Sequence, residues 1–331
     1  MKIFITGATG LVGQHLVGRL LLQGDEVITL IRSVAPFAGV AGKIKIIYGD
    51  VMDLKDLSCV IGRVDVVIHC AAITTFSREF QLSGPKALTA NIEGTRNVAN
   101  LALQLGASQM LHLSSSSVMG DNFEGERDES AQCNPDSDYG RSKFEAEKEV
   151  LKTVSAGLPV TIFRPGLIYG AYDRGGMRAI IDRVYRNRWI TLGNGENKKS
   201  LTYVHNLVDA LMLAVGNSLA FGQIFLVNDG IPYSINELIS TIQHLIGRKE
   251  YCLHVSNVVC LALNKMINML SLRKKGRLNM LAGLITQAMC STTYRIDKAR
   301  RVLNYHPKRM LDQGLAEEID WLVNDKLLGK K

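Results

Sequence analysis

The sequence lacks the features that mark several large classes of protein. Its six cysteines, residues 59, 70, 133, 252, 260 and 290, form no Cys-x-x-Cys pair, which argues against a zinc knuckle or a thioredoxin-type site. Proline is scarce, and neither low-complexity tracts nor a fixed-period repeat is present. No uncharged apolar run is long enough to cross a bilayer, and the strand-like start at Met1–Thr6 does not resemble a signal peptide. We therefore expect a cytoplasmic protein.

The composition that remains is that of an ordinary globular protein. The 331 residues are 47% hydrophobic and 21% charged, which is enough for one large domain or two medium ones. The formal net charge is +8, which indicates either a solvated basic surface or an anionic ligand or surface as partner. We predict a small-molecule substrate and no nucleic-acid partner.

Short apolar runs alternate with helical patterns through the first half of the chain. Continuous apolar runs predict strands that are buried on both faces of a parallel sheet. The expected strands are Lys2–Thr6, Glu26–Ile31, Lys43–Tyr48, Val64–His69, Met110–Ser114 and Val160–Arg164. The expected helices between them are Leu11–Leu22, Asn91–Leu105 and Ser142–Ser155. This rhythm predicts an α/β fold with a doubly wound parallel sheet, the Rossmann fold.

After about residue 165 helical patterns dominate. They fall at Gly176–Asn187, His205–Val215, Ile235–Leu245, Asn257–Leu270 and Gln313–Asp325, with a short strand around Ile224–Asn228. We predict a dinucleotide-binding domain over 1–165 and a smaller, mainly helical substrate-binding lobe over 166–331. Residues 205–230 are expected to return to the sheet.

Three glycines follow the first predicted strand and open the first predicted helix. Gly7 permits a tight turn, Gly10 lets the backbone approach a pyrophosphate, and Gly13 lets the helix pack on the strand. The N–H groups of the helix start attract an anion. The segment from Gly7 through Thr9, Leu11 and Val12 to Gly13 therefore predicts a dinucleotide site.

The end of the second predicted strand bears on the choice of nicotinamide cofactor. An NAD site commonly places an acidic residue there to bind the ribose 2′-hydroxyl, but this strand ends in Leu30-Ile31-Arg32-Ser33. Arg32 is suited to a 2′-phosphate, so NADP(H) is favoured over NAD(H). The alternative is that Arg32 is a solvated strand end.

Two further strand ends contribute to the same site. Asp50 and Val51 are placed to cover the adenine, with Asp50 accepting from the amino group. Cys70, Ala71 and Ala72 are small enough to pass close to a pyrophosphate. His69, just before them, is interpreted as structural rather than catalytic.

A tyrosine and a lysine four residues apart carry the chemistry. Tyr139 and Lys143 share one helix face, where a nearby ammonium favours the phenolate and makes proton exchange with a carbinol oxygen feasible. Lys143 can also bond the nicotinamide ribose. Ser115, in a serine run after the fifth predicted strand, can orient the substrate oxygen. Each signal alone is weak, whereas their combination is not.

The ordered combination resembles the extended short-chain dehydrogenases/reductases, the NAD-dependent epimerase/dehydratase superfamily. The matching pieces are Thr6–Gly13, Asp50–Val51, His69–Ala72, Asn91–Thr95, Ser115 before Val118–Gly120, Tyr139–Lys143, Arg164–Pro165 before Tyr169–Gly170, and Tyr203–Asn206. The resemblance implies a Ser115–Tyr139–Lys143 triad, supported by Asn91, with Pro165 against the nicotinamide. It also suggests a homodimer through the helices Asn91–Leu105 and Ser142–Ser155.

Departures from the family pattern indicate which branch of the superfamily the chain resembles. Ser116 and Ser117 replace the Asp-Glu pair of the 4,6-dehydratases, and Met119 stands where sugar-nucleotide enzymes usually carry Tyr. Lys199 and Ser200 replace a usual Arg-Asp, which weakens a diphosphate contact.

Two apolar stretches near the C-terminus are similar to those of 3β-hydroxysteroid dehydrogenase-like and dihydroflavonol reductase-like members. They are Asn257–Leu272 and Leu278–Cys290, on either side of the basic run Arg273–Arg277. They predict either a core helical hairpin or a lid over a hydrophobic substrate, whose basic turn meets a membrane surface or a carrier phosphate.

The sequence thus favours an NAD(P)-dependent oxidoreductase that interconverts a carbonyl and an alcohol on a fairly apolar substrate. The alternatives are a sugar-nucleotide epimerase with tightly bound NAD and a non-catalytic NADP(H)-binding protein. No metal site is predicted.

Overall fold

A computed structural model of the chain describes residues 1–33, 44–53, 57, 61–120, 123, 125–249, 252–271, 285 and 288–328, with the backbone alone at 268–271. Four sequence predictions lie outside these residues in whole or in part. They are the first residue of the predicted strand Lys43–Tyr48, the last residue of the apolar stretch Asn257–Leu272, the basic run Arg273–Arg277, and most of the apolar stretch Leu278–Cys290.

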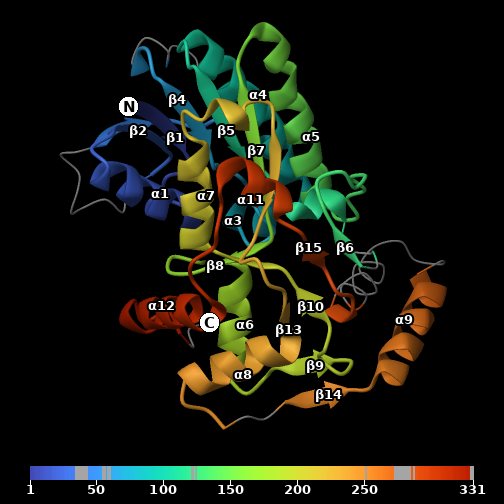
Figure 1. The fold of residues 1–331 in the computed structure, drawn as a ribbon. Coiled ribbons are helices and arrows are strands. Elements are labelled where there is room, and N and C mark those ends of the chain that lie inside the picture. The colour runs from blue at the N-terminus through green and yellow to red at the C-terminus, as the bar shows by residue number, and fades with distance from the viewer. Residues whose placement is uncertain are drawn as a thin grey trace.

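A seven-stranded parallel sheet lies between helices in the upper half of the view in Figure 1. Its strands are β1 (Lys2–Thr6), β2 (Glu26–Ile31), β3 (Ile44–Tyr48), β4 (Val66–His69), β5 (Gln109–Leu113), β7 (Val160–Pro165) and β12 (Ile224–Val227). They lie in the order β3-β2-β1-β4-β5-β7-β12, and each neighbouring pair is parallel. The strand order reverses between β1 and β4, where doubly wound sheets bind their ligands. The predicted Rossmann fold is confirmed.

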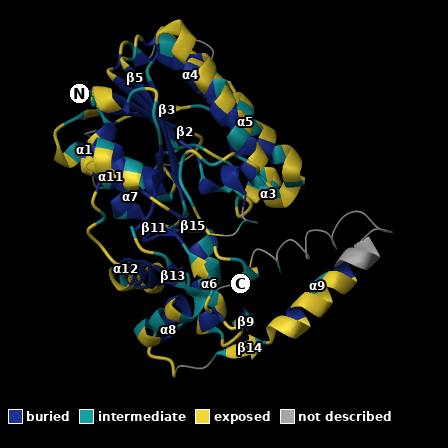
Figure 2. Ribbon diagram, turned by 45° about the vertical axis from the view of Figure 1, so that its right-hand side comes forward, coloured by how far each residue is buried: buried dark blue, intermediate teal, exposed yellow. Residues whose placement is uncertain are grey.

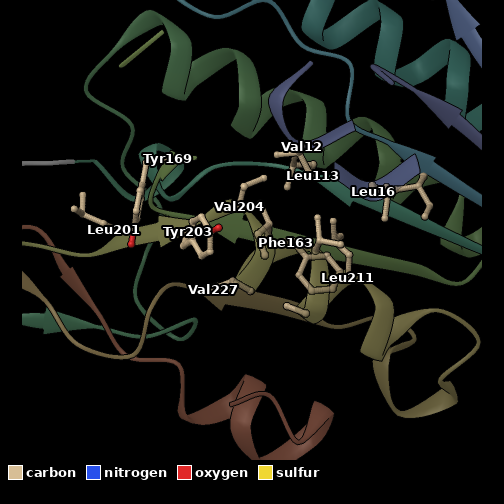
Figure 3. Close-up of a cluster of buried hydrophobic side chains, with 14 of the residues drawn as sticks. Val12, Leu16, Leu113, Phe163, Tyr169, Leu201, Tyr203, Val204, Leu211 and Val227 are labelled. Atoms are coloured by element: carbon tan, nitrogen blue, oxygen red, sulfur yellow. The ribbon is translucent and has the colours of Figure 1, made fainter. Parts of the chain in front are cut away.

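Helices cover both faces of the sheet because successive strand residues point to opposite sides. Ile3 and Ile5 pack in one core with α1 (Leu11–Leu22) and α7 (Val204–Ala214). Phe4 packs in a second core with α4 (Thr89–Gln104) and α5 (Asp138–Lys152). Figure 3 shows the first core, with Leu113 and Phe163 of the sheet against Val12 and Leu211 of these helices.

The C-terminal lobe lies beyond the carboxyl ends of the strands. Its helices are α6 (Gly176–Tyr185), α8 (Ile235–Leu245) and α12 (Leu311–Asn324). Four short strand pairs lie outside the central sheet, and sequence analysis did not predict them. They are β8 (Leu167–Tyr169) with β11 (Leu201–Tyr203), β9 (Ile190–Leu192) with β14 (Leu253–Val255), β10 (Lys198–Lys199) with β13 (Tyr233–Ser234), and β6 (Glu126–Arg127) with β15 (Thr293–Tyr294).

Residues of the lobe and of the sheet are interleaved along the chain. Strand β12 pairs with β7, so the chain returns to the sheet after forming part of the lobe. Helix α11 (Asp297–Leu303) then packs against β12 and α7 before α12 rejoins the lobe. The domain boundary near residue 165 stays a prediction.

Helix α9 (Asn257–Ser271) projects from the lobe and is largely exposed (Figure 2). Its exposed apolar side chains are Val258, Val259, Leu261, Leu263 and Met266, whereas Cys260 and Ile267 are buried. Among the described residues, the predicted hairpin segment thus packs through one face of α9 and leaves the other face exposed. Among the described residues no helix combines the length and apolarity needed to cross a membrane.

Candidate active site

The turn between β1 and α1 forms a cradle that only glycine permits. Gly7 has a φ of +78°, and a Cβ placed there would lie 2.5 Å from the backbone nitrogen of Ala71. A Cβ on Gly13 would lie 2.1 Å from the Gly7 carbonyl oxygen, so α1 packs directly on the turn. The backbone N–H of Gly10 donates to that same oxygen at 3.0 Å.

The N-terminus of α1 lacks a side-chain cap among the described residues. Gly10 is the N-cap residue. Thr9 is exposed in the turn, and Leu11 and Val12 begin the helix. Free N–H groups at a helix start bind anions, so this cradle fits a dinucleotide pyrophosphate.

His69 is held as a neutral structural residue, as the sequence interpretation proposed. Its Nδ1 lies 2.6 Å from the Thr6 hydroxyl and its Nε2 lies 2.9 Å from the Thr95 hydroxyl. Because Thr95 donates its own proton to the Asn91 carbonyl, His69 donates from Nε2 and accepts at Nδ1. Burial lowers the pKa of His69 to about 3.

The segment Cys70–Ala72 runs beside the glycine turn. Burial raises the pKa of the Cys70 thiol to about 12, so this cysteine is unreactive near neutral pH. The next residue, Ile73, is fixed by Asn91, whose side chain bonds both the N–H and the carbonyl of Ile73 at 2.7 and 2.9 Å.

Asn91 also reaches the helix that carries Tyr139. Its Nδ2 donates to the Ser142 hydroxyl at 3.0 Å, and Ser142 donates to the Tyr139 carbonyl at 2.8 Å. Asn91 is buried, so it ties the loop after β4 to the first turn of α5. The resemblance implied that Asn91 supports the Lys143 region, and this role stays a prediction.

Ser115 and Tyr139 are brought together because the first turn of α5 packs closely on the turn that follows Ser115. Helix α5 begins at Asp138, one turn before the predicted start at Ser142, because Ser137 caps it by accepting from the Gly140 N–H at 3.0 Å. A Cβ on Gly140 would lie 2.4 Å from the Ser117 carbonyl oxygen, so α5 lies directly against the turn that follows Ser115.

The hydroxyl of Ser115 is part of a small polar group. It donates to the Ser117 hydroxyl at 3.0 Å and accepts from the Ser117 N–H at 3.2 Å. It also hydrogen-bonds the Tyr139 hydroxyl, which acts to lower the pKa of the tyrosine. The loss of water around the Tyr139 hydroxyl outweighs this contact and raises its pKa to about 12. The phenol is therefore protonated at neutral pH, which is the state that a proton donor requires.

Lys143 lies one turn along α5 and points at the end of β5. Its ammonium donates to the Leu113 carbonyl at 2.6 Å, and the residue is 2% exposed. Burial lowers the pKa of Lys143 to about 8, against the opposing effect of the Glu147 carboxylate. The sequence interpretation had Lys143 favour the phenolate form of Tyr139, but desolvation is the larger effect in this structure.

A buried ion pair supports this lysine and was missed in the sequence. Arg164 of β7 donates to Glu147 of α5 through two bonds of 2.9 and 2.6 Å, and both side chains are buried. The sequence signal was available: Glu147 follows Lys143 by four residues, so Tyr139, Lys143 and Glu147 share one helix face.

The residues that the sequence predicts for the adenosine half of the cofactor are Arg32, Asp50 and Val51, which follow β2 and β3. Arg32 Nη2 lies 2.7 Å from an oxygen of Glu79, and Nη1 lies 4.0 Å from an oxygen of Asp50. The Met52 N–H fixes the Asp50 carboxylate at 2.9 Å. Sequence analysis missed Glu79, which lies on the short helix α3 (Arg78–Ser83). Pro165 lies buried at the end of β7.

Val51 packs against helix α4. A Cβ on Gly94 of α4 would come within 2.7 Å of the Val51 side chain, and Asn97 donates to the Val51 carbonyl at 3.0 Å. The turn after β3 is therefore packed directly on α4.

A second group of ionisable side chains lies between α1, α7 and α12. One ligand atom each from His15, His205 and Glu317 falls within 4.8 Å of the others, which is the residue set of a zinc site. Protein groups already bond these side chains, however: His15 contacts the Ala171 carbonyl at 2.9 Å, and Glu317 accepts from Tyr203 and faces His205. Arg19 and Arg309 also act on His205 as nearby cations. We assign no metal to this group.

Comparison with known proteins identifies the family. A sequence model of the NAD dependent epimerase/dehydratase family matches residues 3–227, and the chain belongs to this family. A 3-beta-hydroxysteroid dehydrogenase of Mycolicibacterium neoaurum is 28% identical over 96% of this chain and 90% of its own length. A UDP-glucose 4-epimerase of Vibrio cholerae is also 28% identical, over 77% of this chain and 78% of its own length.

A solved structure with the same fold contains the expected kind of cofactor. MoeE5 in complex with UDP-glucose and NAD superposes with a TM-score of 0.78 at 25% identity, over 98% of this chain and 100% of its own length. The relatives are thus enzymes of an NAD(P)-binding family that act on small molecules.

Proposed function

We propose that this chain is an NAD(P)-dependent oxidoreductase that interconverts a carbonyl and an alcohol on a fairly apolar substrate. The observation that carries the proposal is the convergence of Ser115, Tyr139 and Lys143 at the carboxyl end of β5. The glycine cradle lies two strands away in the same sheet, at the carboxyl end of β1. Parallel strands end at one edge of a sheet, so cofactor and proton donor meet there.

The residues divide the work of carbonyl reduction between them. A bound reduced nicotinamide supplies the hydride. Tyr139 delivers its proton to the carbonyl oxygen as that oxygen gains negative charge, and solvent later restores the phenol. The Ser115 hydroxyl holds the same oxygen, and the buried charge of Lys143 stabilises the phenolate that remains. Removal of any one of these groups is expected to slow reduction.

The cofactor contacts follow from the cradle and its surroundings. Gly7, Gly10 and Gly13 accommodate the pyrophosphate, and the turn of Asp50 and Val51 covers the adenine. Lys143 and Tyr139 face the nicotinamide ribose, with Pro165 against the ring. We propose NADP(H) as the preferred form, with Arg32 binding the 2′-phosphate.

Two observations favour an apolar substrate over a sugar nucleotide. The Lys199 and Ser200 side chains are already used within the protein, because Lys199 donates to Thr292 at 2.8 Å and Ser200 accepts from the Tyr294 N–H at 3.0 Å. The exposed apolar side chains of α9 offer a surface that suits an apolar ligand.

A sugar-nucleotide epimerase with tightly held NAD is the second candidate. It is favoured by the UDP-glucose and NAD bound in MoeE5 and by the match to the Vibrio cholerae epimerase. A non-catalytic NADP(H)-binding protein is the third, against which the intact Ser115–Tyr139–Lys143 group argues, because a sensor needs no proton donor.

Several proposals rest on the sequence alone. They are a cytoplasmic location, a homodimer through the helices Asn91–Leu105 and Ser142–Ser155, and a membrane or carrier contact through Arg273–Arg277.

One experiment separates the candidates. Purified protein is incubated with NADPH or NADH and, in parallel, a 3-ketosteroid or UDP-glucose. Net oxidation of the dinucleotide with the ketosteroid supports the proposal. Conversion of UDP-glucose to its 4-epimer without net cofactor consumption supports the epimerase instead, and binding without either reaction supports the third candidate.

A further inference from the structure

An ion pair joins two segments that flank the adenosine end of the cofactor site. Arg32 follows the last residue of β2, and Glu79 lies in the first turn of α3, in the segment that follows the Cys70–Ala72 strip. Their side chains approach to 2.7 Å. Both are partly exposed, Arg32 at 58% and Glu79 at 38%, so a ligand can reach them.

Two carboxylates lie near the Arg32 guanidinium, and that of Glu79 is closer than that of Asp50. Glu79 is in direct contact, and Asp50 lies at 4.0 Å while it accepts from the Met52 N–H. One guanidinium charge between two carboxylates gives these three side chains a net charge of −1, which the neighbouring cation of Arg78 offsets in part. A 2′-phosphate, which carries about two negative charges, would enter this group against that charge.

The end of β2 lacks the acidic residue that binds a ribose 2′-hydroxyl in NAD sites, and Glu79 brings a carboxylate to the same place from another element. A carboxylate accepts a hydrogen bond from a hydroxyl but repels a phosphate. Arg32 has the opposite preference, because its fork of donors matches a phosphate.

We propose that Glu79 determines cofactor selectivity by competing with the 2′-phosphate of NADP(H) for Arg32. This inference rests on the proposed dinucleotide site and on Arg32 as the group that binds the 2′-phosphate. NADP(H) binds only after Arg32 has exchanged Glu79 for the phosphate, whereas NAD(H) leaves the ion pair in place. Glu79 thus limits a preference for NADP(H) that Arg32 alone would make strong.

The test is fluorescence titration of the purified full-length protein with NADPH and with NADH, which needs no substrate and no turnover. In Glu79→Gln the affinity for NADPH should rise about three- to tenfold, since exposed ion pairs and like-charge contacts are of this size. The affinity for NADH should not rise. An unchanged NADPH-to-NADH ratio of dissociation constants, or a shift toward NADH, overturns the inference.

Glu26→Gln is the matched control. Glu26 begins β2, pairs with Lys2 at 3.6 Å, and is 61% exposed. It lies at the opposite end of the strand from Arg32, roughly 20 Å away. The substitution removes the same charge as Glu79→Gln does. Because Glu26 lies far from Arg32, it should leave both dissociation constants unchanged. An equal gain in NADPH affinity in this variant would assign the effect to net charge and overturn the inference.

The Arg32→Ala variant separates failure of the inference from failure of the proposed NADP(H) preference. If Arg32 binds the 2′-phosphate, this variant loses NADPH affinity about tenfold and retains NADH affinity. Glu79→Gln should then have a smaller effect in the Arg32→Ala background, because the competition for Arg32 is gone and only the direct repulsion between Glu79 and the phosphate remains. An unchanged ratio in Arg32→Ala refutes the proposed preference. A full Glu79→Gln effect that persists without Arg32 refutes the competition itself.

Discussion

The glycine cradle and helix α9 differ in how closely the fold constrains their side chains. At the cradle, one added methyl group on Gly7 or Gly13 would lie within 2.5 Å of the backbone. Along α9, five large apolar side chains are exposed, and most of the helix is coloured as exposed in Figure 2. Exposed apolar atoms add little to the free energy of unfolding, so we assign their role to ligand contact rather than to the fold. The difference teaches that packing fixes the glycine turn between β1 and α1, whereas packing leaves one face of α9 uncovered among the described residues.

The largest effect on stability is expected from the buried ion pair beside the site. Glu147→Gln leaves the Arg164 guanidinium buried with its charge uncompensated, which should lower the free energy of unfolding by about 3–5 kcal/mol. Glu145→Gln on the same helix is the control, because Glu145 pairs with Lys148 at the surface and its loss should cost about 0.5 kcal/mol or less. Urea unfolding of both variants measures the difference. Equal stabilities of the two variants would show that the Arg164–Glu147 pair does not stabilise the packing of α5 on the sheet.

A glycine pair on α1 tests the cradle itself. Gly13→Ala forces α1 away from the Gly7 carbonyl and should cost about 1–3 kcal/mol, with weaker NADPH binding. Gly18→Ala on the same helix has no atom within 4 Å of the added Cβ and should stabilise by about 0.5–1 kcal/mol. Thermal unfolding and NADPH titration check both values. If Gly13→Ala is as stable as Gly18→Ala and binds NADPH normally, the cradle is not needed.

The pH dependence of reduction follows from the shifted pKa values of the site. Tyr139 stays protonated up to about pH 12, whereas the lowered pKa of Lys143 lies at about 8, so its charged form is lost above that pH. We expect kcat/KM for reduction of a 3-ketosteroid to be level below pH 8 and to fall about tenfold per pH unit above it. A profile that stays level to pH 10 would exclude an essential charge on Lys143.

The smallest effect is expected on α9. Leu261→Ala, at a side chain that is 61% exposed, should change the free energy of unfolding by less than about 0.5 kcal/mol. It should raise KM for a 3-ketosteroid about three- to fivefold through lost apolar contact. Leu219→Ala is the control, since Leu219 is 66% exposed on another part of the surface and should alter neither quantity. Equal KM values in the two variants would remove α9 from the substrate site.

Sequence predicted the sheet well because its strands are continuous apolar runs bounded by glycine or polar residues. The predicted strands Lys2–Thr6 and Glu26–Ile31 and the helix Leu11–Leu22 match the structure to the residue. The start of α5 was placed one turn late, because the apolar period begins at Ser142 while the cap lies at Ser137. Two- and three-residue strands of the lobe were missed, because long-range pairing rather than local pattern forms them.

The candidate site was only partly predictable for a related reason. Motif spacing marked Tyr139, Lys143 and the glycines, since their neighbours in sequence are also their neighbours in space. Glu79 carries no such signal: its helix has no buried residue and no apolar period, and its partner Arg32 lies far away in the sequence. Contacts between loops that follow different strands become visible only in the folded chain.

The central claim is that Tyr139 delivers the proton in a dinucleotide-dependent reduction. The most direct measurement compares wild type with Tyr139→Phe in two assays on the same samples: oxidation of NADPH in the presence of a 3-ketosteroid, and NADPH binding by fluorescence titration. The account predicts that the variant loses about 10³-fold or more in kcat while its dissociation constant for NADPH stays within about twofold. A variant that retains wild-type turnover, or a wild type that binds NADPH and oxidises none, would contradict it.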